Sequence, residues 1–147
     1  MNVVKNHARW IPVIIWMGLI FYLSHQPAEQ SSELSAGVME MLLNVLVVIF
    51  PIHEEIPIIH FLIRKAAHFF AYFVLGILVV HALSKSLKPI WKGSVIALVI
   101  CVLYAITDEV HQLFIPGQSG EVRDVLLDSV GAAVGLSVYL LLNRKSQ

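Results

Sequence analysis

Ionisable side chains gather at a few places in an otherwise apolar sequence, and their types suit proton transfer and cation binding. Asp108, Glu109 and His111 lie close together, and Asp128 follows further along the chain. Carboxylates and imidazoles serve as general acids and bases and also bind divalent metals. We therefore take five residues as catalytic candidates, which are His68, Asp108, Glu109, His111 and Asp128.

Basic and polar residues accompany these candidates and indicate an anionic ligand. Helical spacing would place Arg64, His68 and Tyr72 on one face. Guanidinium and ammonium groups are common partners of phosphate oxygens, so Arg64, Lys65 and Arg123 would contact phosphate. The candidates for substrate binding are Arg64, Lys65, Tyr72, Gln112, Arg123 and Asp124.

Each of these groups also has a simpler structural interpretation. Arg64 and Lys65 could serve only as interfacial anchors, and Tyr72 could be an ordinary packing residue. The Gly-rich segment 116–121 could form either an anion-binding nest or a plain turn. Helix ends need a few charged anchors, but they do not need the concentration of acids, histidine and arginine found over 108–128. We therefore interpret this cluster as functional.

The composition identifies the kind of protein that must hold these residues. Apolar residues make up 58% of the chain and charged residues 14%, against roughly 45–50% and about 25% in a typical soluble domain. Lys+Arg and Asp+Glu number 10 each, which leaves no basic excess for nucleic acid. The single cysteine, Cys101, excludes a disulfide framework and a cysteine-based zinc site. We predict one integral membrane domain over 1–147.

Four apolar stretches predict an all-α, four-helix membrane bundle. The expected transmembrane helices cover about 8–24, 63–83, 91–107 and 124–142, each near the ~20 residues that span a bilayer. A cleaved signal peptide is the alternative for the first stretch, although the residues after it make a poor cleavage site. Apolar residues at three- and four-residue steps predict a further amphipathic helix over about 32–50, either interfacial or re-entrant.

Charge asymmetry predicts that both termini lie in the cytoplasm. The segments 1–9, 84–92 and 143–147 would then be internal, and they contain no acidic residue. The positive-inside rule supports this orientation, because these segments hold Lys5, Arg9, Lys85, Lys88, Lys92, Arg144 and Lys145. The candidate site residues of all the helices then share the outer membrane level.

Asp128 is expected about one turn inside the outer end of its helix. An acid at that depth should face the bundle and find a partner. Gly131 and Gly135 follow it in a small-xxx-small pattern that allows a neighbouring helix to approach closely. The candidate partners of Asp128 are Arg64, Lys65, Arg123 and His68.

The polar segments also carry a family resemblance. They read RKAAHFFAYFVLG over 64–76, TDEVHQLFIPG over 107–117 and SGEVRDVLLDSVG over 119–131. In these segments the chain resembles the VanZ-like family of small bacterial membrane proteins, with departures at Ala71 and Gln118, where many relatives have Glu and Arg. The resemblance implies a link to teicoplanin-type glycopeptide resistance at the cell envelope, without an established reaction.

Three functions are compatible with these observations. The first is a multi-pass protein at the outer face of the cell membrane that binds or acts on an anionic lipid, a lipid-linked cell-wall precursor or a lipoglycopeptide. The second is a membrane enzyme using the cluster for acid–base or divalent-metal chemistry, although no recognised metal or nucleophile motif is present. The third is a small proton-coupled transporter, which four helices with charges at one face favour least. The sequence identifies no definite cofactor and leaves the oligomeric state open.

Overall fold

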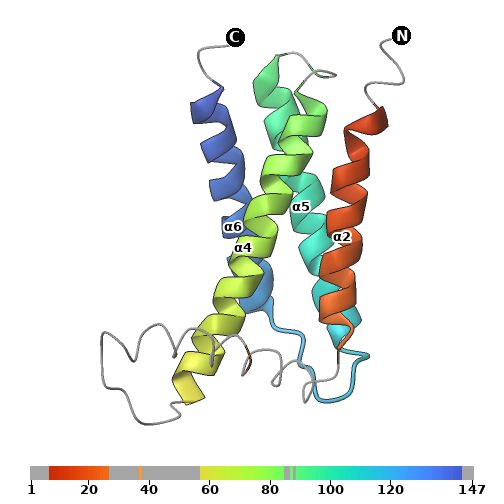
Figure 1. Cartoon of the computed structure of the whole chain (residues 1–147), viewed down its shortest axis with the longest axis vertical. Coiled ribbons are helices and arrows are strands. Elements are labelled where there is room, and N and C mark those ends of the chain that lie inside the picture. Colours follow the sequence, from red (N-terminus) through yellow and green to blue (C-terminus); the bar gives the residue numbers. More distant parts are fainter. Residues whose placement is uncertain (1–6, 27–36, 38–56, 85–86, 88, 144–147) are drawn as a thin grey trace.

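Four helices run side by side in the computed structural model (Figure 1). The structure describes residues 7–26, 37, 57–84, 87 and 89–143. The helices are α2 (Trp10–Ser24), α4 (Pro57–Leu83), α5 (Ile90–Gln112) and α6 (Val122–Leu142), and no strand occurs in these described ranges. The predicted all-α class is confirmed.

Three of the helices are long and apolar enough to cross a membrane. The qualifying spans are Phe61–Leu83, Ile90–Gln112 and Val122–Leu142, each with a mean hydropathy of 2.0. Helix α2 is apolar but has only 15 residues, which corresponds to about 22 Å of helix. It is therefore shorter than the first spanning helix that the sequence predicted.

The helix bounds differ from the predicted ones at several ends. Helix α4 begins at Pro57 instead of near 63, and α5 continues to Gln112 instead of ending near 107. Proline is well tolerated at the first helical position, and no Gly or Pro interrupts the segment 107–112. Asp108 and Glu109 consequently lie on a helix. The predicted amphipathic helix over 32–50 falls outside the described residues, apart from Gly37.

Small residues bring α4 and α6 into backbone contact. Added Cβ atoms at Gly131 and Gly135 would overlap the carbonyl oxygens of Phe69 and Phe73, respectively. The two contacts advance together along both helices, so α4 and α6 run parallel. The close approach predicted from the glycine pattern is confirmed.

Helix α2 is attached to its neighbours through hydrogen bonds to main-chain carbonyl groups. The Trp16 indole N–H donates to the Ala71 carbonyl oxygen at 2.9 Å, and the Tyr104 hydroxyl donates to the Met17 carbonyl oxygen at 2.6 Å. The first bond joins α2 to α4, and the second joins α5 to α2.

The candidate residues lie at one end of the bundle, which we call the polar end. It is the end where α2 and α5 finish and where α4 and α6 begin (Figure 1). The first turn of α2 and the last turn of α6 lie together at the opposite end. This arrangement agrees with two termini on one side of a membrane, while the assignment of that side to the cytoplasm stays a prediction.

Candidate functional site

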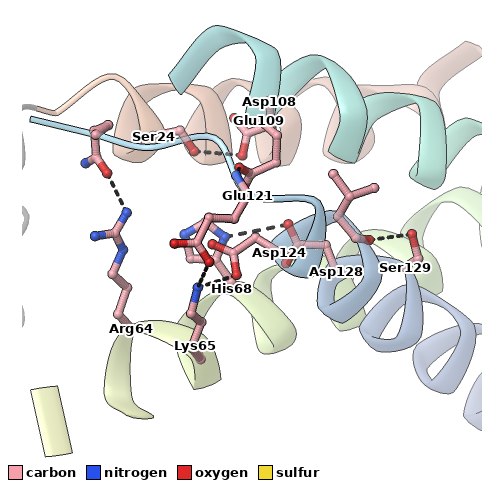
Figure 2. A network of polar contacts seen from close by, with 12 residues as sticks. Ser24, Arg64, Lys65, His68, Asp108, Glu109, Glu121, Asp124, Asp128 and Ser129 are labelled. Atoms are coloured by element: carbon pink, nitrogen blue, oxygen red, sulfur yellow. Dashed lines mark hydrogen bonds and ion pairs between the residues drawn. The ribbon is translucent and has the colours of Figure 1, made fainter. Parts of the chain in front are cut away.

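Every described helix contributes side chains to the polar end (Figure 2). Short polar residues finish α2, basic residues and a histidine lie in the first half of α4, and acids lie at the end of α5 and the start of α6. The polar network includes Ser24, Arg64, Lys65, His68, Asp108, Glu109, Glu121, Asp124 and Asp128.

Asp128 lies at the centre of this network and is fully buried. One of its carboxylate oxygens is 3.6 Å from Nδ1 of His68, which is longer than a good hydrogen bond. Among the described residues, neither Asp128 oxygen has a hydrogen-bond partner. Asp128 thus faces the bundle as expected, and His68 is the neighbour that it meets among the four candidate partners.

Asp108 approaches the same region from α5. Its Oδ2 accepts a hydrogen bond from the Ser24 hydroxyl at 2.9 Å, whereas its buried Oδ1 has no partner within the described ranges. The buried Tyr72 hydroxyl also has no described hydrogen-bond partner. The polar end therefore contains several enclosed oxygen atoms without donors.

Glu109 is held by the loop that joins α5 to α6. One oxygen, Oε2, accepts a hydrogen bond from the backbone N–H of Glu121 at 2.8 Å, and Oε1 is buried without a described partner. The loop also lies close at Gly120, where an added Cβ would be 2.7 Å from the Glu109 carbonyl oxygen. A side chain at position 120 would push the loop away from the carboxylate it fixes.

Three of the catalytic candidates form a group of metal-ligand type. His68, Glu109 and Asp128 each offer one ligand atom, and these atoms lie within 4.8 Å of one another. The ligand atoms come from three different helices, so their meeting depends on the packing of the bundle. Imidazole nitrogen and carboxylate oxygen are both common ligands of divalent transition metals.

Lys65 lies nearer the surface and is occupied by acids. Its ammonium group donates a hydrogen bond to Asp124, and Nζ lies 3.8 Å from a carboxylate oxygen of Glu121. The ammonium is also 5.1 Å from the ring centroid of Phe61. The positive charge of Lys65 is therefore offset by two carboxylates.

Arg64 has a different environment from its neighbour Lys65. Its guanidinium donates a hydrogen bond to the side-chain oxygen of Gln118, whose amide nitrogen donates to the Gln26 carbonyl oxygen at 3.0 Å. No ion pair to an acid is present for Arg64 in the part of the chain that the structure describes. The neutral side chain of Gln118 thus holds the guanidinium, and no acid among the described residues offsets its charge.

Several predicted site residues lie beside the cluster or outside it. Gln112 is buried and interacts with Asp108. His111 instead turns towards α2, where its Nε2 is 3.0 Å from Nδ1 of His25 and its ring stacks on Phe21 with centroids 4.4 Å apart. Arg123 is exposed, and no hydrogen bond or ion pair joins it to another described residue. Neither His111 nor Arg123 is among the three residues that share the ligand-like geometry.

Four contributors escaped the site prediction, which are Ser24, Gln26, Gln118 and Glu121. The Gln118–Gln26 contact that positions Arg64 joins residues far apart in the chain, and glutamine has no distinctive spacing signal. Gln118 stood out only as a departure from the family pattern. The hydrogen bond from Ser24 to Asp108 could not be predicted, because it depends on which faces of α2 and α5 meet.

Comparison with known proteins places this geometry in a family. The sequence model described as VanZ/LLP1 matches residues 9–143, which include all four helices and every residue of the polar network. Neither a curated protein nor a solved structure matches the chain. Because the match covers nearly the whole sequence, the chain belongs to the VanZ/LLP1 family.

Proposed function

We propose that the polar end binds the anionic headgroup of a membrane lipid, or of a lipid-linked precursor of the cell envelope, at the outer face of the cell membrane. Family membership and three membrane-spanning helices make this a membrane protein tied to VanZ-type resistance. The environment of Arg64 is the observation that carries the proposal.

An arginine fixed by neutral groups is suited to receive an anion. The Gln118 amide orients the Arg64 guanidinium without neutralising it. A guanidinium has five N–H donors in a planar fork that matches phosphate oxygens, so donors remain after the bond to Gln118. Arg123 is exposed at the same end and adds a second cation for a headgroup.

The location of these cations favours a lipid over a soluble anion. Large apolar side chains remain exposed on the helices next to the polar end, among them Phe61, Leu113 and Val122. These surfaces would contact acyl chains while Arg64 meets the headgroup. The positive-inside distribution of lysine and arginine assigns this end to the outer leaflet.

The first prediction concerns Arg64→Ala. The purified full chain is placed in nanodiscs that contain phosphatidylglycerol and phosphatidylcholine, and bound lipids are counted by native mass spectrometry. We expect the wild type to retain phosphatidylglycerol selectively. We expect the variant to lose at least about tenfold in selectivity, since a charged hydrogen bond contributes about 1.5–3 kcal/mol.

Lys92→Ala is the matched control because Lys92 is a basic residue beside Trp91 at the opposite end of the bundle. This control should keep the wild-type lipid selectivity. Equal phosphatidylglycerol occupancy in the wild type and Arg64→Ala would contradict the proposal.

A second candidate function is chemistry on the same headgroup. It is favoured by the grouping of His68, Glu109 and Asp128, which can exchange protons or polarise a bound phosphate. The two candidates differ in the mass of the recovered lipid. Binding returns the lipid unchanged, whereas an enzyme yields a product that is lost in His68→Gln.

A further inference from the structure

We propose that His68, Glu109 and Asp128 bind one divalent cation of the Mn²⁺ or Zn²⁺ class inside the polar end. This site lies deeper than Arg64 and uses different side chains. The inference goes beyond the proposed lipid binding and does not depend on it.

The charge balance around the cluster favours a bound cation. Asp108, Glu109 and Asp128 are all buried. Lys65 pairs with Asp124 and Glu121 at the rim, and no ion pair joins Arg64 to the buried carboxylates among the described residues. Buried carboxylates are normally paired, protonated or coordinated to a metal, and His68 alone cannot offset three of them.

The unpartnered oxygen atoms give a second, independent observation. Asp128 has two buried oxygens without a described hydrogen-bond partner, and the side-chain oxygens of Tyr72 and Gln112 are in the same condition. Both Tyr72 and Gln112 are at most 1% exposed. Native structures leave few buried polar groups unsatisfied. These unpartnered oxygen atoms therefore indicate a bound group that oxygen atoms can coordinate, such as a metal ion.

The carboxylates of α5 are held in the manner of metal ligands. Glu109 is anchored through Oε2 by the Glu121 N–H and presents Oε1 without a partner. Asp108 is anchored through Oδ2 by Ser24 and presents Oδ1 in the same way. Coordinating carboxylates are commonly fixed by such outer hydrogen bonds. Asp108 could therefore coordinate the ion as a further ligand or accept a hydrogen bond from one of its ligands.

The donor set and spacing indicate the class of metal. The ligand atoms lie within 4.8 Å of one another. Two ligands at 2.0–2.2 Å from one ion are at most about 4.4 Å apart when they are opposite and about 3.3–3.6 Å apart in a tetrahedral site, so binding requires the side chains to move inwards by up to about 1.5 Å. Carboxylates suit Mn²⁺, and imidazole suits Zn²⁺, so the mixed set favours these ions over Ca²⁺.

Metal binding is tested on the full chain in nanodiscs of phosphatidylcholine alone. Loss of the free Mn²⁺ signal in electron paramagnetic resonance gives the stoichiometry, and Zn²⁺ competition gives the relative affinity. We expect one ion per chain and at least about tenfold weaker binding in Asp128→Asn and His68→Ala, because even outer-sphere changes cost 10–100-fold.

Matched controls separate the site from general charge effects. His81→Ala removes the histidine at the opposite end of α4, and His7→Ala removes an exposed histidine that precedes α2. Both controls should bind Mn²⁺ as the wild type does. Failure of the wild type to bind either ion, or equal binding by Asp128→Asn, would overturn the proposal.

If the variants fail to fold, the melting temperature of the wild type alone still tests the metal site. Mn²⁺ should raise the melting temperature of the wild type, and EDTA should reverse the rise. An unchanged melting temperature at saturating Mn²⁺ would count against the site. Because these samples contain no anionic lipid, failure here leaves the Arg64 experiment standing, and failure of the Arg64 experiment leaves the metal site standing.

Discussion

At the scale of single residues, the buried polar groups of the polar end differ in whether their hydrogen bonds are satisfied, as Asp108 and Tyr72 show. The Ser24 hydroxyl donates to one oxygen of Asp108, while Tyr72, also buried nearby, places a hydroxyl in the cluster without a described hydrogen bond. The first contact satisfies a buried acid. The second leaves a polar atom unsatisfied, which is the pattern of a group held for a ligand instead of for stability.

This contrast gives a stability prediction for two variants. Ser24→Ala should lower the free energy of unfolding by about 1–3 kcal/mol, since it removes the donor to a buried carboxylate. Tyr72→Phe should cause no comparable loss, because the hydroxyl that it deletes has no described partner to leave behind. Thermal or denaturant unfolding in detergent measures both. A larger loss for Tyr72→Phe than for Ser24→Ala would show that the hydroxyl has a structural role.

The sequence predicts the orientation of a single residue where the cost of exposing it to lipid decides that orientation. Asp128 had to face the bundle because a lipid-facing acid is costly. The sequence could not predict that Asp128 lies beside His68 and not beside Arg123, because all four candidate partners were compatible with the spacing. His111 illustrates the same limit, because its proximity to His25 depends on the packing of α2 against α5.

At the scale of helices, the closest packing joins α4 to α6. The glycines of α6 lie directly against main-chain carbonyls of α4, and Gly76 of α4 faces the carbonyl of Ala132 in return. This contact sets the separation between the helix that carries His68 and the helix that carries Asp128. The cluster therefore depends on residues that have no functional groups of their own.

Substitution of one such glycine should disrupt the packing. Gly135→Ala would force a Cβ against the Phe73 carbonyl oxygen, and overpacking of this kind costs about 1–3 kcal/mol. Gly18→Ala is the control, because nothing lies within 4 Å of a Cβ at that position. Unfolding measurements should show a loss for Gly135→Ala alone. Equal stability of the two variants would mean that α4 and α6 can separate at no cost.

The four helices were predictable because each one contains a long run of apolar residues. The end of α5 lies beyond the apolar signal, which fades near Ile106 while the helix continues through Asp108 and Glu109 to Gln112. Hydropathy measures the match to lipid, and a helix ends where its backbone hydrogen bonding ends. The polar last turn of α5 is therefore structure that hydropathy alone does not detect.

At the scale of the whole molecule, the polar groups lie at the opposite end of the bundle from the start of α2 and the end of α6. The first turn of α2 and the last turn of α6 lie at one end of the bundle, and the buried acids lie at the other (Figure 1). The α4–α5 connection and the α5–α6 loop accordingly lie at opposite ends of the bundle. Charge asymmetry predicts which of these ends faces the cytoplasm, and that orientation stays a prediction.

Labelling of engineered cysteines tests this orientation in intact cells. In a background with Cys101→Ser, Ser119→Cys should react with a membrane-impermeant maleimide added outside. Lys92→Cys should react only after permeabilisation. Both native residues are exposed, so accessibility does not bias the comparison. External labelling at Lys92→Cys with protection at Ser119→Cys would reverse the proposed orientation and move the polar end to the cytoplasm.

The brevity of α2 has a consequence for the surrounding bilayer. Its 15 residues cover about 22 Å, and the hydrocarbon core measures about 30 Å. A short hydrophobic segment can be accommodated by local thinning of the bilayer. Thinning beside α2 would draw the headgroup layer inwards next to Ser24 and Asp108, so a lipid could present its phosphate to the bundle without rising out of its leaflet.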